Sequence, residues 1–212
     1  YPHCLAISPS GTIVCDLARG HVAVYECGGG VGGVYEVTQR LRGHVLDVVF
    51  ENDSVLLTVC RELMVYGRTA ADEPFEAQQR LPAVCGGEKC GRIAVSADGG
   101  TVVLGFRRGG IAFVVRSSVG VCEVRRVVAA AHRDEITALS FVPNGNVVSG
   151  SYDRCIKVWS VIGGQFVALR HFRRVHDGAG VRALLVTCDG LLLSGGEDQC
   201  LRICGECLVE DE

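Results

Sequence analysis

The stretch over residues 131–161 constrains the fold of this chain more than any other part of the sequence. Apolar residues alternate with other residues over 136–141, and a two-residue period indicates a half-buried β-strand. A tight turn is expected next, because Pro143 presets φ and Gly145 tolerates positive φ. Further alternating runs predict strands at 146–150, 155–159 and 166–169, with turns at Tyr152-Asp153-Arg154 and Gly163-Gly164. The stretch therefore predicts four short antiparallel strands.

Four polar or indole side chains are spaced along these strands and turns: His132, Ser149, Asp153 and Trp159. Together with the strand pattern, they resemble the repeat unit of the WD-repeat family, whose units form the blades of β-propellers. The resemblance implies that Asp153 bonds His132, His132 bonds Ser149, and Ser149 bonds the indole N–H of Trp159. A polar group that is buried without a partner costs about 1–3 kcal/mol, so such a network would hold the turn on the blade. We therefore interpret His132 and Asp153 as a structural pair rather than an acid–base pair.

Related units recur along the whole chain, at the period of roughly 40–45 residues that is typical of propeller blades. Five units are recognisable, over residues 1–42, 43–84, 85–130, 131–174 and 175–212. The second unit begins at Gly43-His44, the dipeptide that opens many WD repeats. Its Thr58, Glu62 and Tyr66 stand near the serine, aspartate and tryptophan positions, with a shortened third strand.

The remaining units keep less of the polar network. The fifth unit retains His176, Ser194 and Asp198, but has Cys204 where tryptophan is expected. The third and first units are recognised mainly by their strands and glycine-containing turns. Other residue types fill their aspartate and tryptophan positions: Arg108 and Val114 in the third unit, Arg19 and Tyr25 in the first.

We therefore expect an all-β fold, a single WD-repeat β-propeller domain over residues 1–212 with five recognisable blades. Propellers of this family usually have seven blades, so the five units fit best as part of a seven-bladed ring whose other blades lie outside this sequence. A partner chain that completes the ring and a closed five-bladed propeller are the alternatives. An open ring would leave unpaired strand edges, which proteins avoid.

The composition agrees with this fold class and argues against others. Hydrophobic residues make up 48% of the chain and charged residues 21%, which is typical of a globular protein with a sizeable core. The formal net charge of −3 offers no general attraction for nucleic acid. No apolar run approaches the roughly 18 residues of a membrane span, so we expect no membrane insertion. No signal peptide is visible, and we expect an intracellular protein, cytoplasmic or nuclear.

The 12 cysteines are interpreted as reduced, buried thiols. Several fall at or beside expected strand positions: Cys15, Cys60, Cys155, Cys200 and Cys204. A zinc site needs four ligands in paired short spacings, and Cys200 and Cys204 on one expected strand would lie ~13 Å apart. The pair Cys204 and Cys207 lacks the following helix N-terminus that lowers the pKa of a redox thiol. We expect neither a metal nor a cofactor.

Two further patterns suggest catalysis only superficially. The glycine-rich run at 28–33 resembles a phosphate loop, but such a loop needs a helix N-terminus behind it, and the following VYEVTQRL indicates a strand. The repeat accounts for His44, His132 and His176, and no independent Ser-His-Asp set or G-x-S-x-G motif remains. We therefore expect no enzymatic activity.

Basic residues gather near the expected turns. Arg107 and Arg108 occupy the turn between the second and third strands of the third unit, and RHFRRVH at 170–176 lies just before the fifth unit. In the WD-repeat family, such loops open on one narrow face that often holds partners. We expect that face to be surrounded by Arg61, Arg107, Arg108, Arg133, Tyr152 and Glu197. These residues form either a solvated surface or a site for an acidic peptide, a phosphoprotein or an RNA backbone, since Arg and Tyr are favoured interface anchors.

The resemblance implies a non-catalytic scaffold or adaptor for protein–protein interaction within a larger complex. Two short matches leave narrower alternatives open. The start LRGHVLDV at 41–48 is similar to one in ubiquitin-binding propellers of the segregase pathway, and AHRDEI at 131–136 is similar to those of ribosome-biogenesis propellers. A ubiquitin-binding adaptor and an RNA-assembly scaffold are therefore alternative functions.

Overall fold

The computed structural model of the chain describes residues 4–17, 20–27, 34–43, 45–82, 84, 86–161 and 166–204. These residues form antiparallel β-sheets and no helix, which confirms the all-β fold expected from the sequence. The strands of the first two sheets are β1 (Leu5–Ile7), β2 (Ile13–Leu17), β3 (His21–Cys27), β4 (Tyr35–Arg42), β5 (Asp47–Asn52), β6 (Val55–Val59), β7 (Glu62–Gly67) and β8 (Glu76–Pro82). Those of the other sheets are β9 (Cys90–Val95), β10 (Thr101–Phe106), β11 (Ile111–Arg116), β12 (Cys122–Val128), β13 (Ile136–Phe141), β14 (Val147–Ser151), β15 (Cys155–Ser160), β16 (Val167–Arg173), β17 (Val181–Val186), β18 (Leu192–Gly196) and β19 (Leu201–Cys204).

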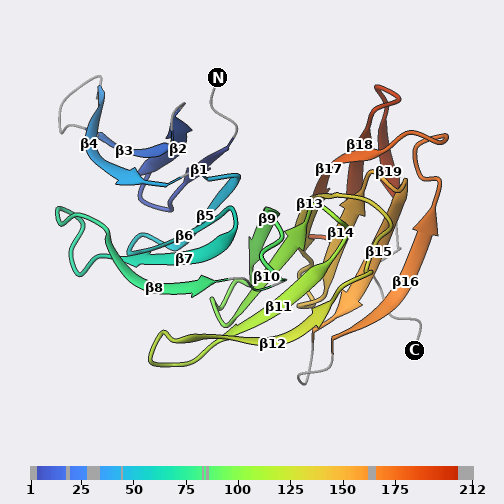
Figure 1. The fold of residues 1–212 in the computed structure, drawn as a ribbon. Helices are drawn as coiled ribbons and strands as arrows, with labels where there is room; N and C mark the ends of the chain where they lie inside the picture. Colours follow the sequence, from blue (N-terminus) through green and yellow to red (C-terminus); the bar gives the residue numbers. More distant parts are fainter. Residues whose placement is uncertain are drawn as a thin grey trace.

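Within every sheet, each strand pairs with the strand that precedes it in the chain. Sheets one to four therefore consist of β1–β4, β5–β8, β9–β12 and β13–β16, and β17–β19 are the described strands of sheet five. Figure 1 shows these sheets following one another in an arc, from sheet one in blue to sheet five in orange and red. The first strands β1, β5, β9, β13 and β17 contact one another from sheet to sheet, and the last strands β4, β8, β12 and β16 are largely exposed. This is the blade arrangement of a propeller.

Apolar side chains fill the space between neighbouring sheets. Between sheets three and four, Phe113 stacks on Phe166 with ring centroids 4.5 Å apart and tilts against Trp159 at 6.2 Å. Two glycines allow the close approach of the sheets. A Cβ on Gly105 would lie 2.7 Å from the side chain of Ile136, and one on Gly150 would lie 2.7 Å from Val181. These glycines occupy the same position in the third and fourth units, so the same feature allows sheet three to approach sheet four and sheet four to approach sheet five.

A buried arginine holds sheet one against sheet two. Arg68 follows β7, is 7% exposed, and forms an ion pair with Glu26 at 2.5 Å. Its other guanidinium nitrogens donate to Thr12 Oγ1 at 3.2 Å and to the carbonyl oxygen of Asp53 at 2.9 Å. The guanidinium also lies 4.5 Å from the centre of the Phe75 ring. A buried charge is costly unless it is paired and hydrogen-bonded, and Arg68 meets both conditions.

The outward faces at the two ends of the arc expose apolar side chains. Leu5 and Ile7 of β1 are 60% and 59% exposed, and Leu201 and Ile203 of β19 are 67% and 65% exposed. Equivalent faces of the inner sheets are covered by the next sheet. The five sheets fall within the five units expected from the sequence, while the single-domain boundaries and the seven-bladed ring stay predictions.

Sheet four differs in two details from the expectation. β14 begins at Val147 rather than at Asn146, because Asn146 belongs to the turn and its carbonyl oxygen accepts from Val142 N at 2.8 Å. β16 continues to Arg173, which pairs with Cys155 at the start of β15. The basic residues at 170–173 therefore lie on the outer strand, and their expected place in a loop of the partner face is wrong.

The second unit also differs from the expectation, because its turn is short and its third strand is not. β7 has the same length as β15. Three residues lie between the paired residues Val59 and Leu63, whereas five lie between the equivalent pair Gly150 and Ile156. Glu62 is consequently the first residue of β7, at the position of Cys155, and sheet two has no residue at the aspartate position.

Candidate functional site

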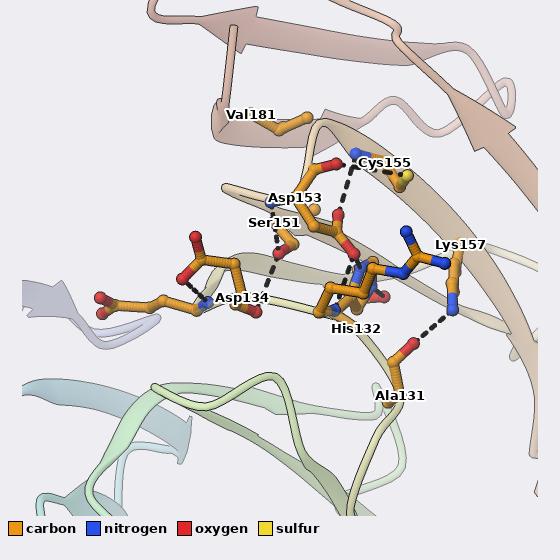
Figure 2. A network of polar contacts seen from close by, with 12 residues as sticks. Ala131, His132, Asp134, Ser151, Asp153, Cys155, Lys157 and Val181 are labelled. Carbon is orange, nitrogen blue, oxygen red and sulfur yellow. Dashed lines mark hydrogen bonds and ion pairs between the residues drawn. The ribbon is translucent and has the colours of Figure 1, made fainter. Parts of the chain in front are cut away.

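The polar network of sheet four is complete in the structure. His132 Nδ1 lies 3.0 Å from Asp153 Oδ2, and His132 Nε2 lies 2.7 Å from Ser149 Oγ. The indole nitrogen of Trp159 donates to the same Ser149 oxygen at 2.8 Å. His132, Ser149 and Trp159 are all at most 3% exposed. Figure 2 shows Asp153 directed at the His132 ring from the turn between β14 and β15.

The chemistry of these side chains determines which of them donates and which accepts each hydrogen bond. Asp153 as a carboxylate can only accept, so His132 donates from Nδ1. The unprotonated Nε2 then accepts from the Ser149 hydroxyl, whose oxygen accepts from Trp159. Burial by itself raises the pKa of Asp153, but hydrogen bonds from His132 and from the amides of Arg133 and Cys155 outweigh it and hold that pKa below its usual range. Because His132 and Ser149 are at most 3% exposed, this set offers no surface on which a substrate could bind.

The same network positions the turn between β14 and β15. The Ser151 hydroxyl donates to the carbonyl oxygen of Asp134 at 2.9 Å and accepts from Asp153 N at 3.0 Å. Lys157 donates from Nζ to the carbonyl oxygen of Ala131 (Figure 2). The turn and the connection into β13 are thus joined by backbone and side-chain hydrogen bonds, so the surface residues on both have fixed positions.

Sheet five contains a partial copy of this network. His176 lies 2.9 Å from Asp198 Oδ1 through Nδ1 and 2.9 Å from Ser194 Oγ through Nε2. His176 and Ser194 are at most 1% exposed. The side chain of Cys204, at the tryptophan position, lies outside the described side chains. These contacts place His176, Ser194 and Asp198 as the repeat implied.

Sheet two keeps only the inner part of the network. Thr58, at the serine position, is 3% exposed, and Tyr66 pairs with Leu56 as Trp159 pairs with Val147. Burial raises the pKa of the Tyr66 phenol, and a hydrogen bond with Thr58 acts in the opposite direction. Glu62 forms an ion pair with Arg80 on the neighbouring strand β8 instead of acting as the aspartate. His44 lies outside the described residues.

The six expected partner residues lie on turns and connections at one end of the sheets, which we call the turn face. Arg61 is in the turn after β6, Arg107 and Arg108 are in the turn after β10, Arg133 precedes β13, Tyr152 is in the turn after β14, and Glu197 is in the turn after β18. Hydrogen bonds across sheets place these segments side by side. Cys90 N donates to Cys60 O at 2.6 Å, and His132 N donates to Gly109 O at 2.8 Å. All six residues are exposed or half-buried.

The structure also shows partners for these residues that the sequence did not indicate. Arg182, from the start of β17, lies 4.7 Å from the centre of the Tyr152 ring and 2.7 Å from Glu197. Arg107 lies 3.5 Å from Glu135, and the backbone amide of Arg108 donates to the Glu88 carboxylate. Arg182 belongs to the same sheet as Glu197 and to the sheet next to Tyr152, whereas Glu88 and Glu135 lie on connections between sheets. Their spacing along the chain therefore carries no signal for the contact.

The cysteines are less uniformly buried than expected. Cys15, Cys90 and Cys122 are buried and Cys60 and Cys155 are half-buried, but Cys200 is exposed and precedes β19 rather than lying within it. The described cysteines are free thiols. Burial raises the pKa of Cys4 to about 12 and also raises that of Cys122, so these thiols are poor nucleophiles. Cys27 and Cys188 are exposed as well, so the interpretation as buried is wrong for Cys27, Cys188 and Cys200.

Two sequence patterns that suggest a phosphate loop and a redox or metal site lie wholly or partly outside the described residues. These are the glycine-rich run at 28–33 and the pair formed by Cys204 and Cys207. Within the described ranges, no group of three or more His, Cys, Asp or Glu side chains is arranged to hold a metal ion. The same ranges contain no helix long and apolar enough to cross a membrane.

Comparison with known proteins agrees with this geometry. Residues 124–160, which run from β12 to the end of β15, match the family model described as WD domain, G-beta repeat. The crystal structure of the WD40 β-propeller domain of Doa1 matches with a TM-score of 0.72 and 18% sequence identity, over 94% of this chain and 62% of that one. The comparison with curated proteins found no match. The fold is therefore that of a WD-repeat β-propeller, and the chain spans about 62% of the solved propeller domain.

Proposed function

We propose that this protein is a non-catalytic scaffold that docks a protein or peptide partner on its turn face, as a cytoplasmic or nuclear subunit of a larger complex. WD-repeat propellers generally act as interaction scaffolds and are typically non-catalytic. One observation supports the proposal most directly. The His and Asp side chains that acid–base chemistry would need are enclosed in the networks of sheets four and five, whereas the turn face presents exposed Arg side chains and the half-buried Tyr152.

The rigidity of the turn face supports a docking role. Tyr152 N donates to Glu135 O at 3.1 Å, and Glu197 N donates to Gly180 O at 3.0 Å. These backbone bonds add to the side-chain network around Asp153. A surface whose groups are already fixed loses less conformational entropy when a partner binds. The turn face therefore suits recognition of a rigid or extended partner.

Charge divides the turn face into two parts with different preferences. Arg61, Lys89, Arg107 and Arg108 lie together around sheets two and three, where they outnumber the neighbouring Glu88 and Glu135 and favour an acidic partner. Around sheets four and five, Arg182 is already paired with Glu197. A protein partner with an acidic segment is thus the preferred class. Ubiquitin and a ribonucleoprotein remain the alternatives implied by the short sequence matches.

Affinity purification of the tagged chain from lysate, with and without RNase, tests this function. A double variant with Arg107→Glu and Arg108→Glu is compared with Arg125→Glu, an exposed charge reversal on β12. We expect proteins that resist RNase to co-purify with the native chain and the control, and to be lost from the double variant. Partners that the double variant retains, or that RNase removes, would contradict a protein-docking turn face. Direct binding of recombinant ubiquitin separates the adaptor from the general scaffold.

A further inference from the structure

Four arginines surround the turn between β14 and β15 at the outer corner of sheet four, and we call them the corner patch. Its members are Arg133, Arg154, Arg173 and Arg174, and all four are exposed. Their backbones lie side by side. The amide of Arg133 donates to Asp153 Oδ2 at 3.0 Å, and Arg173 pairs with the residue after Arg154. The amide of Val175 donates to the carbonyl oxygen of Arg154 at 3.4 Å, which holds Arg174 against the same turn.

The positive charge of the corner patch is not balanced locally. Within the described ranges, the four guanidinium groups form no ion pair and no hydrogen bond. The acids nearby already have partners of their own. Asp153 belongs to the closed network, and Asp134 accepts from the amide of Glu135 at 2.7 Å. Asp177 pairs with Arg202 at 2.5 Å.

A neighbouring histidine responds to this excess of positive charge. Burial, together with the charges of Lys157 and Arg173, holds the pKa of His171 below its usual range. Both cations lie on the same side of sheet four as His171, because Lys157 pairs with His171 and Arg173 is two residues further along β16. The corner is therefore a place where an anion would be stabilised.

Two arginines of the corner patch occupy backbone positions that suit glycine. In sheets three, four and five, the same turn position is left-handed, with φ of 81° at Gly109, 72° at Arg154 and 61° at Gln199. Each of these residues donates from its amide to the carbonyl oxygen three residues earlier. Arg174 is also left-handed, with φ of 54°. Glycine adopts this region without strain, whereas a Cβ crowds the following carbonyl oxygen. Arginine at these positions costs stability, which directs attention to a role in binding.

We infer that the corner patch binds a phosphoryl group on a serine or threonine of a partner peptide. The planar guanidinium fork fits two oxygens of a phosphoryl group at once. Arginine clusters are a recurring means of recognising phosphorylated segments. A phosphoryl group has nearly two negative charges at neutral pH and would meet several unpaired cations together. The inference rests on the proposed function and names a chemical feature of its partner.

An RNA strand fits the corner patch less well. A phosphate backbone needs a continuous basic path, but the exposed acids Asp134 and Asp177 follow closely after Arg133 and Arg174 in the chain. Base stacking needs an exposed aromatic ring, and the aromatic rings at this corner, Tyr152 and Phe172, are half-buried. The patch is thus suited to one phosphoryl group rather than to a long polyanion.

Fluorescence anisotropy on the purified chain tests the inference. The probe is a fluorescein-labelled mixture of short peptides with a fixed central phosphoserine and varied flanking residues, and the matched mixture has serine at the centre. Salt is kept at about 0.15 M, where exposed charges are screened beyond about 8 Å. We expect the phosphoserine mixture to bind at least about tenfold more tightly. Equal binding of the two mixtures, or equally tight binding of a mixture with central glutamate, would overturn the assignment of a phosphoryl site.

Glycine substitutions separate binding from stability. We expect Arg154→Gly and Arg174→Gly each to weaken binding of the phosphoserine mixture at least about tenfold. Neither should lower the melting temperature, because the relief of backbone strain offsets the larger chain entropy of glycine. Gln199→Gly makes the same backbone change in sheet five and should leave binding unchanged. A similar loss of binding in Gln199→Gly, or a fall in the melting temperature of Arg154→Gly, would contradict a binding role for Arg154.

The alternative occupant and the parent proposal have separate outcomes. A fluorescein-labelled oligouridylate that binds more tightly than the phosphoserine mixture would replace the inference with an RNA site. Weak binding of that mixture, with partners still lost from the Arg107 and Arg108 double variant, would overturn the inference alone. Retention of those partners by the double variant would overturn the proposed function instead.

Discussion

Sheets four and two begin from the same repeat and reach opposite states on the turn face. In sheet four, His132, Ser149, Asp153 and Trp159 form a closed set of hydrogen bonds with little exposure. In sheet two, no described residue stands at the aspartate position, and a hollow of about 610 Å³ lined in part by Val45, Met64 and Tyr66 opens at the same end of the sheet. The strands themselves hardly differ, since β6 and β7 pair in the same register as β14 and β15 up to the turn.

The comparison shows how a propeller can change a surface without changing its core. The polar network is needed where a long turn brings buried donors and acceptors together, because each unpaired group costs about 1–3 kcal/mol. A turn that is two residues shorter removes the aspartate, and with it the need for a histidine to donate a hydrogen bond to that aspartate. Thr58 and Tyr66 remain buried at the serine and tryptophan positions. The shorter turn and the missing aspartate position in sheet two are thus a single change.

The largest loss of stability is expected from a substitution at the tryptophan position. Trp159→Ala should destabilise the protein by about 3–5 kcal/mol, because it removes a buried ring and leaves a cavity against Phe113. Tyr66→Phe, at the matched position of sheet two, should cost only about 0.5–1.5 kcal/mol, the net value of one hydrogen bond. Urea denaturation measures both. Similar losses for the two variants would mean that the sheets do not differ in the way described.

The second effect concerns the histidine of the closed network. His132→Ala should destabilise the protein by about 1–3 kcal/mol, because Ser149 and Asp153 each lose a partner. The exposed His171→Ala on β16 serves as the control and should leave the melting temperature unchanged. An unchanged melting temperature for His132→Ala, together with loss of a catalytic turnover, would refute the structural assignment.

A third effect is the pH dependence of the same network. The folded pKa of Asp153 lies below its usual range, because its hydrogen bonds outweigh the effect of burial. The carboxylate therefore contributes stability above the unfolded pKa of about 3.9, and this contribution is lost as pH falls through the folded pKa. We expect the stability difference between the native chain and Asp153→Asn to shrink between about pH 6 and about pH 2. The raised pKa values of Asp47 and Glu51 act in the opposite direction but cancel in this difference. A difference that is constant with pH would contradict the assigned ionisation.

The smallest effect is expected at the acidic residue of sheet two. Glu62→Gln should leave stability unchanged, because its partner Arg80 is 64% exposed and surface ion pairs contribute little. Comparison of its denaturation curve with that of Asp153→Asn tests whether the two acids have different roles. A loss of stability as large as that of Asp153→Asn would show that Glu62 has the role of the aspartate in the repeat.

Local sequence was sufficient to predict most of the fold. Strands of alternating residues and turns with proline and glycine predicted the hairpins of sheet four, and β13 has the expected bounds. The spacing of His132, Ser149 and Asp153 indicated their contacts through resemblance to a repeat family. The turn length of sheet two was misread, because Glu62 has the right chemical type and separation from Thr58 but already belongs to β7. Residue type and spacing alone do not distinguish a short turn from a short strand.

The sequence by itself determined the repeat, the strand order within each sheet and the identity of the buried network, because all of these depend on residues close together in the chain. Only the tertiary structure placed Arg182 between Tyr152 and Glu197, and Arg68 between Glu26 and Phe75. It alone revealed the hollow beside Met64. These features arise where separate sheets or connections pack together, and their geometry depends on the distance and angle between elements that short-range patterns do not encode.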